Sequence, residues 1–147
     1  MIVERLLPEA TIEVTVTEVM RAAFDDNVVH EVYGTAFMVG HMELAARHLI
    51  LPARETDEEG IGYKVEVTHV APAPVGSRVM VTARLRGVEG NRVTCEVEAR
   101  TGHGVIGTGT VTQVLLPLEA LYRRFARHGV LETEGTTAPP DARIEER

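Results

Sequence analysis

Hydrophobic and polar residues alternate over five stretches of the chain, which is the pattern of β-strands with one buried face. In the first stretch, Ile12, Val14 and Val16 alternate with polar residues. The other four stretches cover residues 63–67, 79–85, 93–99 and 105–116. Because the turn signals at 88–91 and 101–104 have hairpin length, we expect the last three strands to form an antiparallel meander.

The stretch from Phe37 to Leu51 does not alternate and predicts a helix instead. Its only polar side chains are those of His41, Glu43, Arg47 and His48. Pro52 ends this helix, and because most of its circumference is apolar, the five strands must cover it. A strand, a buried helix and then four strands is the order of the hot-dog fold, an α+β domain whose five-stranded antiparallel sheet wraps one long helix. A shorter helix, Pro117 to His128, closes the ordered part.

Two glycines, Gly107 and Gly109, lie on one face of the last predicted strand. Their missing side chains would let another part of the backbone approach closely. We therefore expect tight packing against this strand.

The length of 147 residues and an apolar share of 44% fit one domain with a single core. From Leu131 onward the chain is acidic, contains a Thr-Thr-Ala-Pro-Pro stretch and shows no apolar periodicity. We therefore divide the chain into a hot-dog domain at residues 1–130 and an acidic, mobile tail at residues 131–147.

Charge and composition exclude several functions. A net charge of −7, from 22 acidic and 15 basic residues, opposes nucleic-acid binding. No run of 18 apolar residues and no signal-peptide pattern occurs, so we expect a cytoplasmic protein without a membrane segment. Cys95 is the single cysteine, which excludes a disulfide framework or thiolate metal cage and suggests a small buried hydrophobe.

Glu43 lies among apolar residues in the middle of the predicted helix. An ionised carboxylate there destabilises the fold unless it has an ion-pair partner, so its presence indicates either such a pair or a catalytic role. On spacing alone an ion pair with Arg47, four residues later, is favoured over a role as nucleophile or base. His41 and His48 fall on the opposite side of the helix, so the sequence does not favour a metal site.

Two further polar residues border the same helix. His69 continues the apolar face of Tyr63, Val65 and Val67, so its imidazole should point toward the helix as a core residue or a catalytic one. Thr35 immediately precedes the apolar run, which is the usual position of an N-cap. The helix N-terminus behind Thr35 could also hold a developing oxyanion.

Two motifs that contain these residues, G-T-A-F-M-V-G-H-M-E at 34–43 and V-T-H-V-A-P-A-P at 67–74, resemble the fluoroacetyl-CoA thioesterase-like family of hot-dog proteins. The likeness continues in R-L-R-G-V-E-G-N-R at 84–92 and I-G-T-G-T at 106–110, and covers roughly residues 32–114. It implies a catalytic triad of Thr35, Glu43 and His69 and a backbone contact to the acyl thioester near Gly62. It also implies a homodimer or dimer of dimers with sites at the subunit boundary. Coenzyme A would be part of the substrate, with no separate cofactor and no metal.

Features around the triad bear on the substrate. We assign Gly34, Phe37 and Val39 to substrate binding, and the resemblance implies that residues 20–33 form a lid over the acyl pocket. The lid is several residues shorter than in the fluoroacetate-specific enzyme, and Gln113 stands where the resemblance leads us to expect a basic residue. We therefore expect a small acyl group rather than fluoroacetate specificity. The arginines that would contact the phosphates of coenzyme A are Arg84, Arg86, Arg123 and Arg127.

Two alternatives stay open. The stretch from Asp25 to His30 resembles the D-x-N-P-x-H motif of hot-dog enoyl-CoA hydratases, although valine replaces the proline and only four residues separate His30 from Thr35. A non-catalytic acyl-CoA-binding hot-dog dimer is the second alternative, but such a sensor would need a DNA-binding module that the acidic chain does not suggest.

Overall fold

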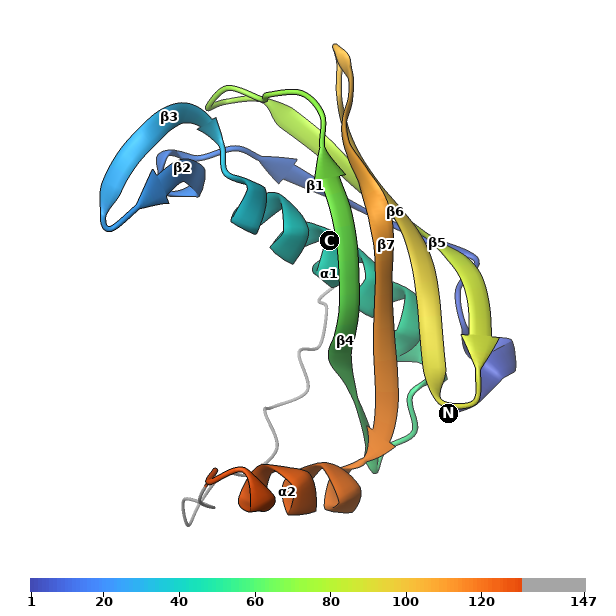
Figure 1. Ribbon diagram of the computed structural model, residues 1–147. Helices are drawn as coiled ribbons and strands as arrows, with labels where there is room; N and C mark the ends of the chain where they lie inside the picture. The colour runs from blue at the N-terminus through green and yellow to red at the C-terminus, as the bar shows by residue number, and fades with distance from the viewer. Residues whose placement is uncertain (131–147) are drawn as a thin grey trace, which may run out of the picture.

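The computed structural model describes residues 1–130 and contains a five-stranded antiparallel sheet that curves around one long helix (Figure 1). The strand order is β1-β5-β6-β7-β4. These strands are β1 (Glu9–Thr15), β4 (Glu58–His69), β5 (Arg78–Glu89), β6 (Arg92–Thr101) and β7 (Gly104–Pro117). The predicted hot-dog fold and the β5-β6-β7 meander are confirmed, while the predicted tail at 131–147 lies outside the described residues.

Two helices and a hairpin complete the fold. Helix α1 (Thr35–Ile50) lies in the curve of the sheet, and α2 (Leu118–Arg127) follows β7. A hairpin of β2 (Arg21–Phe24) and β3 (Asn27–Tyr33) leads into α1. Three short 3-10 helices are η1 (Val3–Arg5), η2 (Glu18–Met20) and η3 (Leu51–Ala53). No helix among residues 1–130 is long and apolar enough to cross a membrane.

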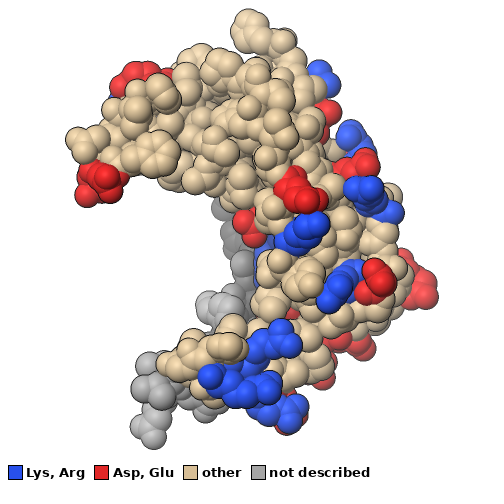
Figure 2. All heavy atoms as spheres, viewed as in Figure 1, with Lys and Arg blue, Asp and Glu red and all other residues tan. Residues whose placement is uncertain are grey.

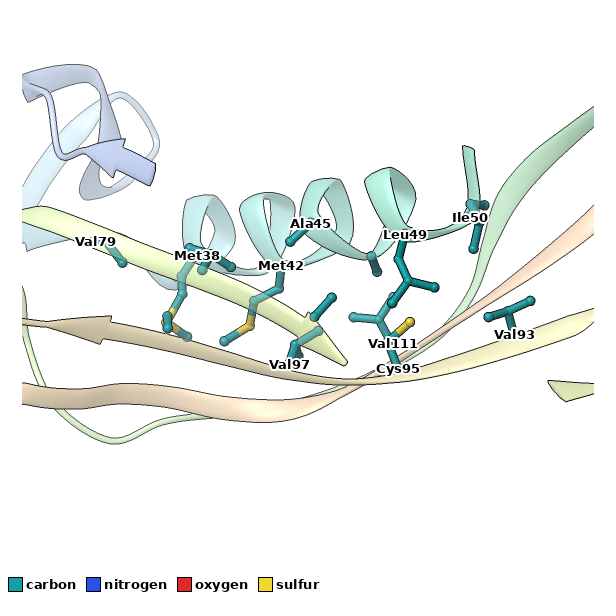
Figure 3. Packing of buried hydrophobic residues seen from close by; sticks show 14 of the residues in the cluster. Met38, Met42, Ala45, Leu49, Ile50, Val79, Val93, Cys95, Val97 and Val111 are labelled. Carbon is teal, nitrogen blue, oxygen red and sulfur yellow. The ribbon is translucent and has the colours of Figure 1, made fainter. Parts of the chain in front are cut away.

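The core lies between α1 and the concave face of the sheet. Met38, Met42, Ala45 and Leu49 point from α1 toward Val97, Cys95 and Val111 of the sheet (Figure 3). Each large aliphatic side chain buried here stabilises the fold by about 1.5–3 kcal/mol. Burial also raises the pKa of the Cys95 thiol to about 11, in agreement with its predicted role as a small hydrophobe.

The β2-β3 hairpin occupies most of the segment that we predicted to be a lid. Its turn consists of Asp25 and Asp26, which both have positive φ angles, 49° and 61°, as a two-residue hairpin turn requires. The side-chain amide of Asn27 donates to the carbonyl oxygen of Asp25 over 2.8 Å. The acidic and amide residues of the hydratase-like motif are therefore the residues that form this turn.

A β-bulge in β4 changes which side chains face the helix. The pairing of β4 with β7 shifts register between Gly62 and Lys64, so Tyr63 is the extra residue. Tyr63 is 57% exposed and its ring lies under the guanidinium of Arg92, 4.5 Å from the ring centroid. Our expectation that Tyr63 shares a face with Val65 is wrong, because one inserted residue reverses the side on which a strand residue points.

Gly109 of β7 confirms the close backbone approach that the glycine pattern predicts. A Cβ atom at this position would lie 2.0 Å from the carbonyl oxygen of Glu66 and 2.8 Å from the Cα atom of Val67, both backbone atoms of β4. At Gly107 the nearest atom would be Sδ of Met38 at 2.6 Å, which belongs to a flexible side chain. The two strands can therefore pack in this way only if residue 109 is glycine.

We expect Gly109→Ala to lower the free energy of unfolding by roughly 1–3 kcal/mol, because an added methyl group would push two backbones apart. Urea denaturation measures the loss. Gly102→Ala is the matched control, since a Cβ at that position has nothing within 4 Å. Equal stability of the two variants would contradict the proposed steric requirement.

Candidate active site

Thr35 and His69 form a hydrogen-bonded pair where α1 begins and β4 ends. The Oγ1 atom of Thr35 lies 2.8 Å from Nδ1 of His69. The expected N-cap role of Thr35 is wrong: Gly34 is the N-cap, Thr35 is the first helical residue, and no side chain caps the helix. The hydroxyl is therefore used to orient an imidazole, and the first amides of α1 have no partner within the helix.

The second ring nitrogen of His69 has no hydrogen-bond partner among the residues that the structure describes. Its Nε2 atom is buried and forms no hydrogen bond within the described part of the chain. A buried polar atom without a partner is costly, and such atoms often mark functional sites. We name Thr35 and His69 the Thr35 half-site.

A cleft of about 300 Å³ opens beside this half-site. The residues that line it include Ala22, His30, Tyr33, Thr35, His69 and Pro72. One wall therefore belongs to the β2-β3 hairpin and the other to the end of β4 and the following loop. This arrangement agrees with the expectation that the segment before α1 covers a pocket next to Thr35.

Glu43 does not form the expected ion pair with Arg47. Nη1 of Arg47 donates to Oε1 of Glu59 over 2.7 Å, and Arg54 donates to the second oxygen of Glu59 at the same distance. Burial opposes ionisation of Glu59, but the hydrogen bonds from Arg47 and from the Gly60 amide outweigh it and lower its pKa. Arg47 is thus held by a different acid, and the carboxylate of Glu43 has no hydrogen bond or ion pair among residues 1–130.

The carboxylate of Glu43 lies against Gly62 of β4. A Cβ atom at residue 62 would lie 3.2 Å from Oε2 of Glu43, so the missing side chain leaves the carboxylate next to bare backbone. Gln113 is the partner of Gly62 in the β4-β7 pairing and is only 5% exposed. Its Nε2 atom is buried and has no hydrogen-bond partner in the described chain. We name Glu43, Gly62 and Gln113 the Glu43 half-site.

The two half-sites lie apart within one chain. Glu43 follows Thr35 by eight residues, a rise of about 12 Å along the helix axis. Gly62 precedes His69 by seven residues, which is about 23 Å along an extended strand. The structure therefore brings Thr35 and His69 together but does not bring Glu43 to them.

His41 of α1, which does not line the cleft, has a structural explanation. His41 forms a hydrogen bond through Nδ1 with the hydroxyl of Tyr33, and the two rings stack with centroids 5.8 Å apart. Burial raises the pKa of Tyr33 and lowers that of His41, so both groups are neutral near pH 7. Across residues 1–130, no group of three or more His, Cys, Asp or Glu side chains is placed to hold a metal ion.

A sequence model of the family described as fluoroacetyl-CoA-specific thioesterase matches residues 16–119, which include both half-sites. The chain belongs to this family of thioesterases. The thioester-hydrolase class that the sequence motifs imply is thus the class of its family.

Three relatives place the chain within the thioesterase family more closely. A fluoroacetyl-CoA thioesterase of Streptantibioticus cattleyicolor is 44% identical over 89 residues, which cover 60% of this chain and 64% of that protein. A crystal structure of a hypothetical Thermus thermophilus protein, described as a thioesterase superfamily member, is 49% identical with a TM-score of 0.76 and covers 82% of this chain and 91% of that one. A mutant fluoroacetyl-CoA-specific thioesterase in complex with fluoroacetate and CoA is 34% identical with a TM-score of 0.72 and covers 77% and 95% of the two chains.

The residues predicted to bind substrate in this thioesterase-family chain lie in different places. Gly34 is buried, and a Cβ there would lie 3.2 Å from the carbonyl oxygen of Met20, so glycine lets the hairpin close onto the helix start. Val39 lies on the helix face of Glu43, about 40° away, whereas Phe37 lies about 120° away from Glu43 and is 41% exposed. The sequence singled out Gln113 only as a departure from the family pattern, and its unpartnered buried amide could be found only from the structure.

Proposed function

We propose that the protein hydrolyses an acyl-CoA thioester with Thr35, Glu43 and His69. The observation that carries this proposal is the carboxylate of Glu43, which lies beside Gly62 without a partner among residues 1–130, while Glu59 holds the neighbouring Arg47. An ion pair with Arg47 is thereby removed, and a role in chemistry accounts for a half-buried carboxylate in the middle of an apolar helix. Membership of a thioesterase family supports the same reaction.

The chemistry follows from the groups that are available. Glu43 either attacks the thioester carbonyl carbon to form an acyl-enzyme or removes a proton from an attacking water. His69 transfers a proton through Nε2 to the departing thiolate, with Thr35 fixing the ring through Nδ1. The amides at the start of α1, the Thr35 hydroxyl and the Gln113 amide are the donors that could stabilise the oxyanion. The overall reaction consumes water and gives a carboxylic acid and the free thiol of coenzyme A.

We further propose that two chains assemble into a homodimer, which can pair again as a dimer of dimers, and that each site is completed across the boundary. Within residues 1–130 strand β4 has a neighbouring strand on one side only, so its other edge presents unpaired backbone groups. With Tyr63 bulged out of the ladder, an antiparallel pairing of two β4 strands about a two-fold axis at residue 66 would place Gly62 opposite His69 of the partner subunit. The Glu43 half-site of one chain then meets the Thr35 half-site of the other.

The substrate that we propose carries a small acyl group. The cleft beside Thr35 has a volume of about 300 Å³, at the lower end of the range for small-molecule sites. Each added methylene should contribute about 0.8 kcal/mol until the pocket is full. We therefore expect kcat/KM to rise and then fall across a series of straight-chain acyl-CoA thioesters. A value that still rises at long-chain acyl-CoA would refute the small pocket.

A panel of acetyl-, fluoroacetyl-, phenylacetyl- and crotonyl-CoA tests the reaction class in the same assay. Release of free thiol supports hydrolysis. Hydration of crotonyl-CoA that is abolished by His30→Ala would instead favour the hydratase alternative, and binding without turnover would favour the non-catalytic one. The cytoplasmic location and the independence from metal and cofactor remain predictions, the latter tested by adding EDTA to the same assay.

A further inference from the structure

Two arms of the molecule project from opposite ends of the sheet, on the side where α1 lies (Figure 1). One arm is the β2-β3 hairpin, and the other is α2. The hairpin is held just after β4 ends, where the amide of Tyr33 donates to the carbonyl oxygen of Ala73 over 2.8 Å. Helix α2 is held just before β4 begins, where the amide of Leu118 donates to the carbonyl oxygen of Asp57 over 2.7 Å. The two arms therefore lie at the two ends of edge strand β4.

Both arms expose large hydrophobic side chains. On the hairpin, Phe24 is 72% exposed, and Val28 and Val29 are exposed as well. On α2, Tyr122 and Phe125 are 40% and 39% exposed, and their rings pack edge to face with centroids 6.3 Å apart. Exposed hydrophobic residues that gather in this way mark surfaces that another protein surface covers.

The two arms also carry opposite charges. Asp25 and Asp26 form the turn of the hairpin, and Arg124 and Arg127 lie in the last turn of α2. None of these four residues forms an ion pair with another residue of the described chain. Figure 2 shows acidic side chains at the end of the hairpin and basic side chains gathered over α2. The arms are therefore complementary both in charge and in their exposed hydrophobic residues.

The two-fold axis of the proposed homodimer brings these complementary arms together. An antiparallel pairing exchanges the two ends of β4 between the subunits. With the axis at residue 66 and Tyr63 outside the ladder, Glu58 at the start of β4 comes opposite Ala73 of the partner subunit. Within one chain the arms cannot meet, because the 12 residues of β4 separate them by roughly 35–40 Å along the strand.

We propose that α2 of one subunit packs against the β2-β3 hairpin of the other, with Tyr122 and Phe125 against Phe24 and the two arginines beside the two aspartates. The inference rests on the proposed function, from which it takes the homodimer and the acyl cleft beside Thr35. Because the hairpin lines that cleft with residues such as Ala22, α2 positions one wall of the partner's acyl pocket without touching the substrate. We name this the hairpin–α2 contact.

Chemical cross-linking tests the hairpin–α2 contact without any need for enzymatic activity. Phe24→Cys/Phe125→Cys places one thiol on each arm, and Cys95 is buried, so a short bis-maleimide should join only the new thiols. We expect a covalent dimer on a denaturing gel. Phe24→Cys/Met80→Cys is the matched control, because Met80 is 41% exposed but lies on the outer face of β5, and it should stay monomeric on the gel. Dimers in sedimentation that give no more cross-linking than this control overturn the contact.

Charge reversal on α2 tests whether the contact positions the hairpin. We expect Arg124→Glu/Arg127→Glu to lower kcat/KM roughly three- to ten-fold, because two attractions between exposed charges become repulsions. The loss should be equal for an acyl-CoA and for the N-acetylcysteamine thioester of the same acyl group, which lacks the nucleotide. A loss confined to the acyl-CoA would assign Arg127 to a phosphate of coenzyme A and overturn the contact. Arg5→Glu, which reverses an exposed arginine of η1, is the control and should change neither value.

A second substitution identifies the partner of the two arginines. Adding Asp25→Asn/Asp26→Asn to the reversed α2 removes the repulsion, and asparagine tolerates the positive φ angles of the turn. We expect the combined variant to recover most of the lost kcat/KM. No recovery would overturn the contact and favour the acidic residues after Val130 as the partners of α2. Specific cross-linking in a protein that hydrolyses no thioester would support the contact and refute the proposed reaction.

Discussion

Glu43→Gln is expected to lower kcat for thioester hydrolysis by roughly 10²–10⁴-fold, the range for loss of a general acid or base. The amide has nearly the shape of the carboxylate but can neither attack a carbonyl carbon nor accept a proton from water. Since Glu43 has no ion-pair partner among the described residues, the substitution breaks no such interaction in the folded chain. Steady-state kinetics should therefore show a large fall in kcat, while the melting temperature should change little.

Arg47→Gln is the comparison that distinguishes catalysis from an ion pair. If Glu43 existed to neutralise Arg47, the two variants would lose similar stability and little rate. We expect Arg47→Gln to lower stability instead, because it removes the 2.7 Å hydrogen bond to Glu59, and to retain most of the wild-type rate. Unchanged turnover in Glu43→Gln would refute the proposed role of Glu43.

The fold was largely predictable because the alternation of hydrophobic and polar residues along a strand can be seen in a single sequence. It located all five strands of the sheet, and the apolar run located α1 to within about two residues. The bulge at Tyr63 was not predictable, because one extra residue leaves no local signal while it reverses the facing of its neighbours. The β2-β3 hairpin was also missed: its Asp25-Asp26 turn uses positive φ angles without glycine.

The sequence indicated which residues belong to the site, but it did not indicate which of them contact one another. Capping is the usual role of a threonine at the start of a helix, yet here Thr35 binds His69, which is 34 residues away. Spacing within a helix likewise suggested Glu43 as the partner of Arg47, whereas the fold brings Glu59 closer. In both cases a contact with a residue distant in the sequence replaced the expected local contact. Spacing along the chain alone cannot show which of the two contacts will form.

The division of the triad into two half-sites leads to a prediction about mixed dimers. Glu43→Gln leaves the Thr35 half-site intact, and His69→Ala leaves the Glu43 half-site intact. In a dimer with one chain of each kind, one boundary site combines Glu43 from one subunit with His69 from the other, and the second site lacks both. Random mixing makes half of the dimers mixed, so two inactive variants together should recover about a quarter of the wild-type activity.

The two variants are unfolded and refolded together, and sedimentation confirms that dimers have formed. Thr35→Ala mixed with His69→Ala is the matched control. Thr35 and His69 bind each other within one chain, so every boundary site in that mixture lacks one of them and activity should stay at the level of the single variants. Recovery only in the first mixture is expected from a site shared between subunits. If dimers form but neither mixture recovers activity, all three residues of each site lie in one chain and the shared site is contradicted. The shared site depends on the antiparallel β4 pairing, because that pairing brings Glu43 within reach of the other subunit's imidazole.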